Sequence, residues 1–168
     1  LTTTIVIRLM AMSGRILWTV AGIFENIGTV QEGTDPIARS YAVPDKPFAA
    51  IHNKDLSHSW QDSTTGNSIS VFSNCNEVLD LSLHQIQTDT LSVFEKYEII
   101  EETTLRLGQN NALSTVAVGK IDSAEIKTKL ISTHRNGCSY SLSFVAPVTA
   151  YTAGLPIFEK FVQGFKLP

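Results

Sequence analysis

The stretch that decides the fold is residues 124–147, AEIKTKLISTHRNGCSYSLSFVAP, in which two alternating runs flank Asn136-Gly137. Asn-Gly between alternating runs is the strongest short-range signal for a β-hairpin, because both residues tolerate the positive φ of a two-residue turn. Apolar and polar residues alternate along both arms, and Ser139, Ser141 and Ser143 fall on the face that we expect to be solvated. This pattern predicts an antiparallel sheet that carries helices on a single face.

Six further segments extend and cover this hairpin. Apolar residues at spacings near 3 and 4 predict amphipathic helices over residues 82–95 and 152–165. Extended runs between turn residues predict strands over residues 57–62, 68–74, 97–107 and 112–119. Together, the hairpin and these segments predict an α+β fold with an antiparallel sheet of about six strands and two helices.

Composition limits the class of protein. The chain has 168 residues, of which 43% are hydrophobic and 17% charged, as expected for one globular domain. A net charge of −3 argues against a nucleic-acid partner, because such proteins normally carry a basic face. Mean hydropathy is +0.06 and no apolar run reaches about 18 residues, which excludes an ordinary transmembrane helix.

The chain divides into three predicted parts. Residues 1–24 resemble a degenerate export segment, with a short amphipathic helix or an upstream extension as the alternatives. Val20-Ala21-Gly22 matches the start of a bacterial lipobox, but Ile23 stands where the lipidated cysteine would be. Residues 25–46 have no sustained period and are predicted to be a linker or loosely ordered arm. Residues 47–168 form the single globular domain.

Cys75 and Cys138 each fall at the end of a predicted strand. The end of one antiparallel strand lies beside the start of its neighbour, so the two thiols are placed to form a disulfide. A bridge would indicate a location outside the cytoplasm, whereas the alternative is a pair of unrelated reduced thiols.

Residues with catalytic or metal-binding chemistry are few. The histidines are not spaced as zinc ligands and neither cysteine has a close partner, so we expect no metal, no cofactor and no catalytic residue. His134, beside the central turn, is the one histidine that we considered for a hydrolase. Glu98, Glu101 and Glu102 form an acidic cluster on a predicted strand edge that could meet a cation or a basic partner.

The order of elements resembles the PsbP-like α/β/α sandwich, which also occurs in a nuclear-transport regulator of the small GTPase Ran and in small bacterial envelope proteins. Over residues 47–166 the chain also resembles small bacterial lipoproteins of unassigned function. That resemblance implies the Cys75–Cys138 disulfide and an accessory or binding role without a shared active site. The motifs that carry it are Trp60, Thr65-Gly66-Asn67-Ser68-Ile69-Ser70, Ser73-Asn74-Cys75, Asn136-Gly137-Cys138-Ser139-Tyr140 and Phe158-x-x-Phe161-x-x-Gly164-Phe165-Lys166.

The sequence therefore favours a non-enzymatic accessory protein of the cell envelope that binds another envelope protein through a sheet face or edge. We expect it to be exported, in the periplasm or the cell envelope. Peripheral association with the membrane is possible, but position 23 is Ile23 and not the cysteine that a lipid anchor requires. A carrier of a small apolar ligand between sheet and helices is the second hypothesis. A hydrolase that uses His134 is the third.

Overall fold

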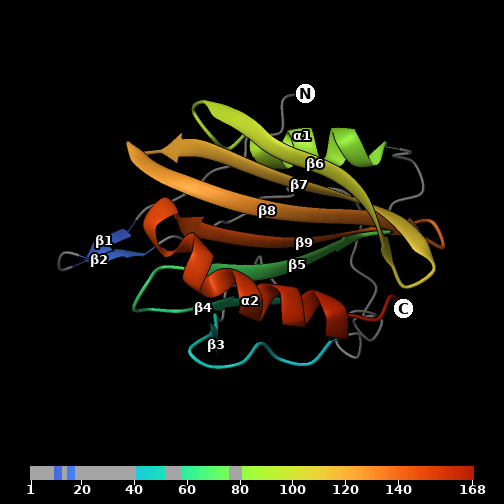
Figure 1. Ribbon diagram of the computed structural model, residues 1–168, viewed down its shortest axis with the longest axis horizontal. Coiled ribbons are helices and arrows are strands. Elements are labelled where there is room, and N and C mark those ends of the chain that lie inside the picture. Colours follow the sequence, from blue (N-terminus) through green and yellow to red (C-terminus); the bar gives the residue numbers. More distant parts are fainter. Residues whose placement is uncertain (1–9, 13–14, 18–40, 52–57, 76–80) are drawn as a thin grey trace.

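The computed structural model describes residues 10–12, 15–17, 41–51, 58–75 and 81–168 (Figure 1). A seven-stranded antiparallel sheet in the order β3-β4-β5-β9-β8-β7-β6 forms the body of the protein. Its strands are β3 (Ala49–Ala50), β4 (His58–Gln61), β5 (Ser68–Asn74), β6 (Tyr97–Leu107), β7 (Asn110–Ile121), β8 (Ala124–Arg135) and β9 (Cys138–Pro147). The helices are α1 (Leu83–Leu91) and α2 (Val148–Gly164), while β1 (Met10–Met12) and β2 (Arg15–Leu17) pair in a separate sheet.

The two helices cover opposite faces of the sheet, so the prediction of helices on a single face is wrong (Figure 1). The β8–β9 register pairs Lys129 with Phe144 and Leu130 with Ser143. Because directly paired residues share a face, most apolar residues of β8, such as Leu130, and most of those of β9, such as Phe144, point to opposite sides. Each side then needs its own helix, and the result is a three-layer α/β/α sandwich.

The core under α2 is aromatic. Phe158 of α2 stacks on Phe144 of β9 with ring centroids 5.6 Å apart, and both side chains are fully buried. Tyr151 lies 5.3 Å from the Phe144 ring, and Phe161 lies 5.5 Å from Trp60. These contacts attach α2 to the centre of the sheet.

The core under α1 is smaller and contains a polar network. Leu91 packs in one cluster with Ile126 and Leu130 of β8. Buried Gln87 donates to the Leu113 carbonyl oxygen at 2.8 Å and accepts a hydrogen bond from the Thr115 hydroxyl. Burial of an amide requires such partners, and they fix α1 on β7.

The serines of β9 lie on the α1 face and are not the solvated positions that we predicted. Ser143 is buried and Ser141 is half-buried. The Ser141 hydroxyl is hydrogen-bonded to that of Ser132 at 3.0 Å. Cross-strand hydroxyl pairs of this kind let a polar strand face pack against another layer.

Most predicted boundaries are close to those in the structure. Ser82 caps α1 by accepting a hydrogen bond from the Gln85 backbone N–H, but α1 ends at Leu91 and not near residue 95. The chain leaves the helix there because the Glu95 N–H donates to the Lys120 carbonyl oxygen of β7. The sheet has seven strands, where we predicted about six, because the two residues of β3 pair with β4.

Only parts of the segment before residue 47 are described. Tyr41 lies within the range that we predicted to be a linker, and its ring packs against Trp60 at 5.1 Å and Phe165 at 6.4 Å. The packed part of the chain therefore includes Tyr41. Most of residues 1–24, Ile23 among them, and residues 25–40 lie outside the described residues. Among the helices that are described, none combines the length and apolar character needed to cross a membrane.

Candidate functional site

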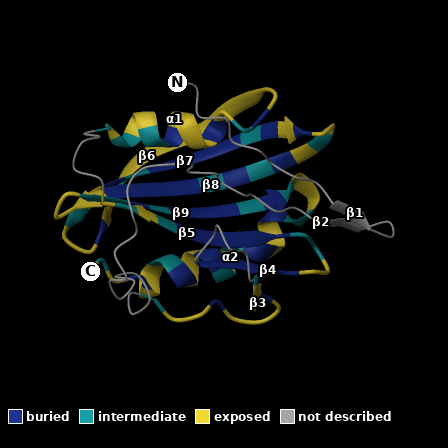
Figure 2. Cartoon of the chain, turned by 180° about the vertical axis from the view of Figure 1, so that it is seen from behind, coloured by how far each residue is buried: buried dark blue, intermediate teal, exposed yellow. Residues whose placement is uncertain are grey.

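Strand β6 forms one edge of the sheet, and among the described strands it is hydrogen-bonded only to β7 (Figure 1). All residues from Tyr97 to Thr104 are exposed, whereas the strands in the middle of the sheet are mostly buried (Figure 2). The exposed run includes three large apolar side chains, Tyr97 at 39%, Ile99 at 42% and Ile100 at 53%. An apolar strand edge of this length is a common site of association with another chain.

The three predicted glutamates all lie on this edge, but on different faces. The register pairs Glu98 with Val118 and Glu101 with Val116, which places both on the α2 face. Glu102 pairs with Thr115 and faces α1, where its Oε2 lies 3.5 Å from Nδ1 of His84. The bulge between Ile99 and Glu101 produces this arrangement, because the extra residue Ile100 shifts the alternation by one.

The electrostatic effect of the acidic edge reaches α2. Burial, together with the negative charges of Glu159 and Glu101, raises the pKa of Tyr151 to about 12. No Lys or Arg forms an ion pair with Glu98 or Glu101 within the described ranges. The edge is therefore a negatively charged surface with apolar side chains between the charges, and we call residues 97–104 the acidic edge.

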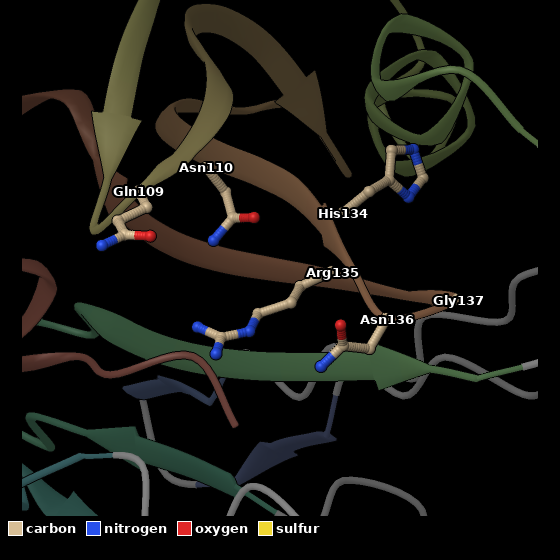
Figure 3. Close-up of a pocket in the computed structure, with 6 residues that line it drawn as sticks. All are labelled: Gln109, Asn110, His134, Arg135, Asn136 and Gly137. Atoms are coloured by element: carbon tan, nitrogen blue, oxygen red, sulfur yellow. The ribbon is translucent and has the colours of Figure 1, made fainter.

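A second feature is a shallow depression of about 440 Å³ where the β6–β7 and β8–β9 turns meet. It is lined by Gln109, Asn110, His134, Arg135, Asn136 and Gly137 (Figure 3). The lining is polar and open to solvent, and it contains no carboxylate, serine or cysteine. This composition differs from the mostly apolar lining of a typical small-molecule pocket.

His134 lies in this depression but has none of the partners of a hydrolytic site. Its side chain points away from that of Arg135, since successive residues of β8 face opposite sides (Figure 3). Ser139 is its cross-strand neighbour, and the Ser139 hydroxyl donates instead to the Asn74 carbonyl oxygen at 3.4 Å. A nucleophile, a base and an orienting group are thus not brought together around His134 in the described part of the chain.

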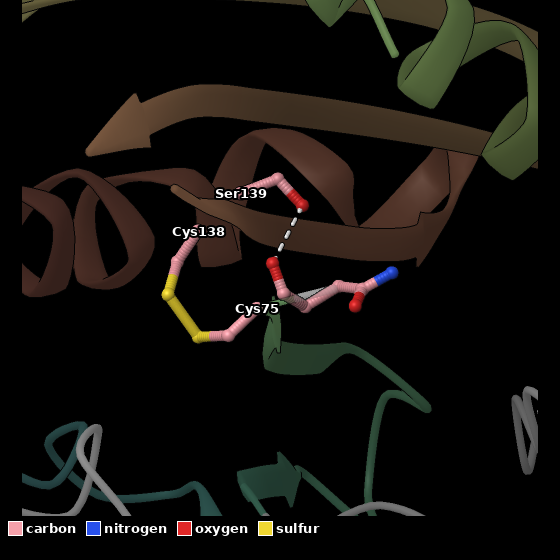
Figure 4. Close-up of a disulfide and its surroundings, with 4 residues drawn as sticks. Cys75, Cys138 and Ser139 are labelled. Atoms are coloured by element: carbon pink, nitrogen blue, oxygen red, sulfur yellow. Dashed lines mark hydrogen bonds between the residues drawn. A yellow bond between two sulfur atoms is a disulfide. The ribbon is translucent and has the colours of Figure 1, made fainter. Parts of the chain in front are cut away.

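The disulfide joins β5 to β9 at the end of the strand pair (Figure 4). Asn74 is paired with Ser139, so Cys75 and Cys138 are the next residues in the same register, and their Cα atoms are 4.0 Å apart. The prediction of this disulfide is confirmed. The two cysteines are 63 positions apart in the sequence, and the segment between them contains α1, β6, β7 and β8.

A metal site has no support among the residues described, because no group of three or more His, Cys, Asp or Glu side chains converges. The apolar residues Tyr97, Ile99 and Ile100 of the acidic edge were not predicted as part of the site. The pattern YEIIEE could have pointed to them, because glutamates, which are rarely buried, directly flank these apolar residues and indicate an exposed strand.

Comparison with known proteins supports the fold. The sequence matches no family model and has no significant similarity to a curated protein. LpqN of Mycobacterium tuberculosis, described as involved in cell envelope biogenesis, has a TM-score of 0.59 at 9% identity, covering 76% of this chain and 82% of its own. Cyanobacterial PsbP (CyanoP) from Synechocystis has a TM-score of 0.50 at 10% identity, covering 73% and 83%.

PA94 of Pseudomonas aeruginosa, a protein of unknown function, has a TM-score of 0.50 at 7% identity and covers 58% of this chain and 69% of its own. At these identities the likeness shows the fold alone. The fold class is therefore the PsbP-like α/β/α sandwich, as the sequence resemblance implied. The same comparisons confirm the resemblance to an envelope protein, LpqN, at the level of the fold.

Proposed function

We propose that this protein is a non-enzymatic accessory protein of the bacterial cell envelope that binds another protein through its acidic edge. The observation that carries the proposal is the continuous exposure of Tyr97 to Thr104 on a strand whose outer side pairs with no other strand of the described part of the chain. Long, flat edges are usually shortened, charged with lysine or covered, because they otherwise pair with other chains. A bound partner would cover this edge and so explain why it lacks these protections.

The envelope location is supported by two observations. The Cys75–Cys138 disulfide favours an oxidising compartment, since cytosolic thiols are normally kept reduced. The fold is shared with LpqN, which is described as involved in cell envelope biogenesis. Both are compatible with export of this chain.

The polar surfaces of the molecule support binding over catalysis. The acidic edge offers apolar contact area and charge, whereas the depression around His134 offers amides and one guanidinium. Between the sheet and the two helices lie fully buried side chains such as Phe144, Phe158 and Leu91. No specific observation favours the apolar-ligand carrier over the accessory role.

Affinity capture from an envelope extract tests the proposal. The disulfide-bonded protein is immobilised, and a stoichiometric protein partner is expected. The variant Glu98→Lys/Glu101→Lys/Glu102→Lys should lose that partner. The matched control Asp89→Lys/Glu125→Lys changes exposed carboxylates away from the edge and should retain it.

Other outcomes would point elsewhere. Equal capture by the edge variant and the control would contradict the acidic edge as the binding surface. A co-purifying lipid without a protein would favour the carrier. An activity that disappears in His134→Ala while the far-ultraviolet circular dichroism is unchanged would reveal an enzyme.

A further inference from the structure

The backbone of β6 determines what kind of partner the edge can accept. In an antiparallel sheet, alternate residues of an edge strand direct their N–H and C=O groups away from the sheet. Strand β6 pairs with β7 along almost its whole length from Tyr97 to Leu107, about 36 Å at the usual rise of a strand. Within this strand there is no proline and no lysine, the residues that most often protect an edge. An extended segment of another chain can therefore pair with its open side.

The bulge leaves most of this open edge regular. Only Ile100 is unpaired in the β6–β7 register, and the pairing from Glu101 to Leu107 is continuous. The side chains of an added strand would lie beside Glu101 and Thr103 on one face and beside Glu102 and Thr104 on the other. A strand with polar, charged side chains on both faces matches this surface.

Charge decides between the candidate occupants. Pairing with a second copy of β6 would bring Glu98, Glu101 and Glu102 of two strands close together, and like charges on paired strands are destabilising. Among the described residues, the only basic side chain within 4 Å of the three glutamates is His84, beside Glu102. Lysine or arginine side chains on an added strand would supply the missing partners and would also speed association.

We propose that the partner of the acidic edge is a basic, extended segment that adds to β6 as an eighth strand of the sheet. This inference rests on the proposed function and specifies its chemistry. Main-chain hydrogen bonds to β6 hold the segment, and its Lys or Arg side chains beside the glutamates select it. The partner is thus recognised by extended conformation and positive charge together.

Synthetic peptides of about ten residues, the length of a long strand, provide the probe. One peptide carries Lys on both of its faces, with Thr and Val at the other positions, and is N-methylated along one edge, which prevents self-association and leaves the other edge free. A second has the same side chains but is N-methylated along both edges. A third carries Glu in place of Lys.

Binding is measured by titration calorimetry on the disulfide-bonded protein, with amide hydrogen exchange of β6 as the structural readout. The one-edge peptide should bind and slow the exchange of alternate β6 amides. Blocking both edges should weaken binding at least about tenfold, as should replacing Lys by Glu. The variant Glu98→Gln/Glu101→Gln/Glu102→Gln should lose affinity, and the control Asp89→Asn/Glu125→Gln should not.

Two results would overturn the inference. Equal binding of the one-edge and two-edge peptides would show attraction by charge without strand pairing. Binding without protection of β6 amides would place the peptide elsewhere. If the edge variant still loses an envelope protein that the wild type captures, either result contradicts only strand addition as the mode of binding. If the wild type captures no protein, the proposed function itself is contradicted.

Discussion

At the scale of single residues, Gly154 shows how closely α2 approaches the sheet. A Cβ atom at this position would contact Nδ2 of Asn67 and would lie 2.8 Å from Cζ of Phe144. Asn67 cannot easily move, because it is buried and its Nδ2 donates to the Ala150 carbonyl oxygen at 3.2 Å. The absence of a side chain at Gly154 is thus a requirement of the α2 layer.

We expect Gly154→Ala to lower the free energy of unfolding by about 1–3 kcal/mol, the usual cost of overpacking a core. The matched control is Gly164→Ala at the end of α2, where a Cβ would meet nothing within 4 Å. Higher helix propensity should make the control neutral or slightly stabilising. Urea denaturation measures both, and equal stability of the two variants would contradict the packing that we describe.

Asp62 is the residue whose ionisation contributes most clearly to a local structure. Burial disfavours its charge, but hydrogen bonds from the Thr65 hydroxyl at 2.6 Å and the Thr64 N–H at 2.9 Å outweigh burial and lower its pKa. A lowered pKa in the folded state means that this stabilisation is present above the unfolded pKa, about 3.9, and is lost as pH falls through the folded value.

Asp62→Asn should therefore reduce stability by about 1–2 kcal/mol at neutral pH, since it weakens hydrogen bonds to a charged acceptor. The difference from wild type should shrink as the pH is lowered below about 4, where wild type also loses the charge. Asp89→Asn, which alters an exposed carboxylate on α1, is the control and should stay within about 0.5 kcal/mol. A deficit that is constant from pH 7 to pH 3 would contradict the role of the charge.

At the scale of elements, the disulfide constrains half of the sheet. It joins cysteines 63 positions apart, and the loss of that constraint from the unfolded chain is worth up to about 4 kcal/mol by loop-closure entropy. We expect Cys75→Ser/Cys138→Ser to lower the unfolding free energy by about 2–4 kcal/mol. Unfolding of wild type with and without reductant is the check, and identical urea midpoints would contradict a structural disulfide.

The sequence predicted the elements well because most carry strong local signals. Asn136-Gly137 determines the β8–β9 turn, and β5 and β6 have the ranges that their turn residues implied. The register of β8 with β9 could also have been predicted from the sequence, but we did not use it. A two-residue turn pairs Arg135 with Cys138, so Leu130 must pair with Ser143, and most apolar residues of the two strands must face opposite sides.

At the scale of the whole molecule, the candidate site could be predicted only in part. Glu98, Glu101 and Glu102 were placed on a strand edge from their charge, and β6 is an edge strand. That β6 is the outermost strand depends on the order of seven strands, which local pattern does not encode. The bulge at Ile100, which places Glu98 and Glu101 on the same face, is likewise visible only in the pairing of β6 with β7.

The central claim is that the acidic edge is occupied by a partner protein in the cell. The most direct measurement is site-specific photo-crosslinking in the native envelope, with a photoreactive side chain at Ile100 of β6 or at Val148, an exposed apolar residue at the start of α2. We predict one discrete protein adduct from Ile100, removed by Glu98→Lys/Glu101→Lys/Glu102→Lys, and none from Val148. An adduct from Val148 with no adduct from Ile100 would contradict the claim.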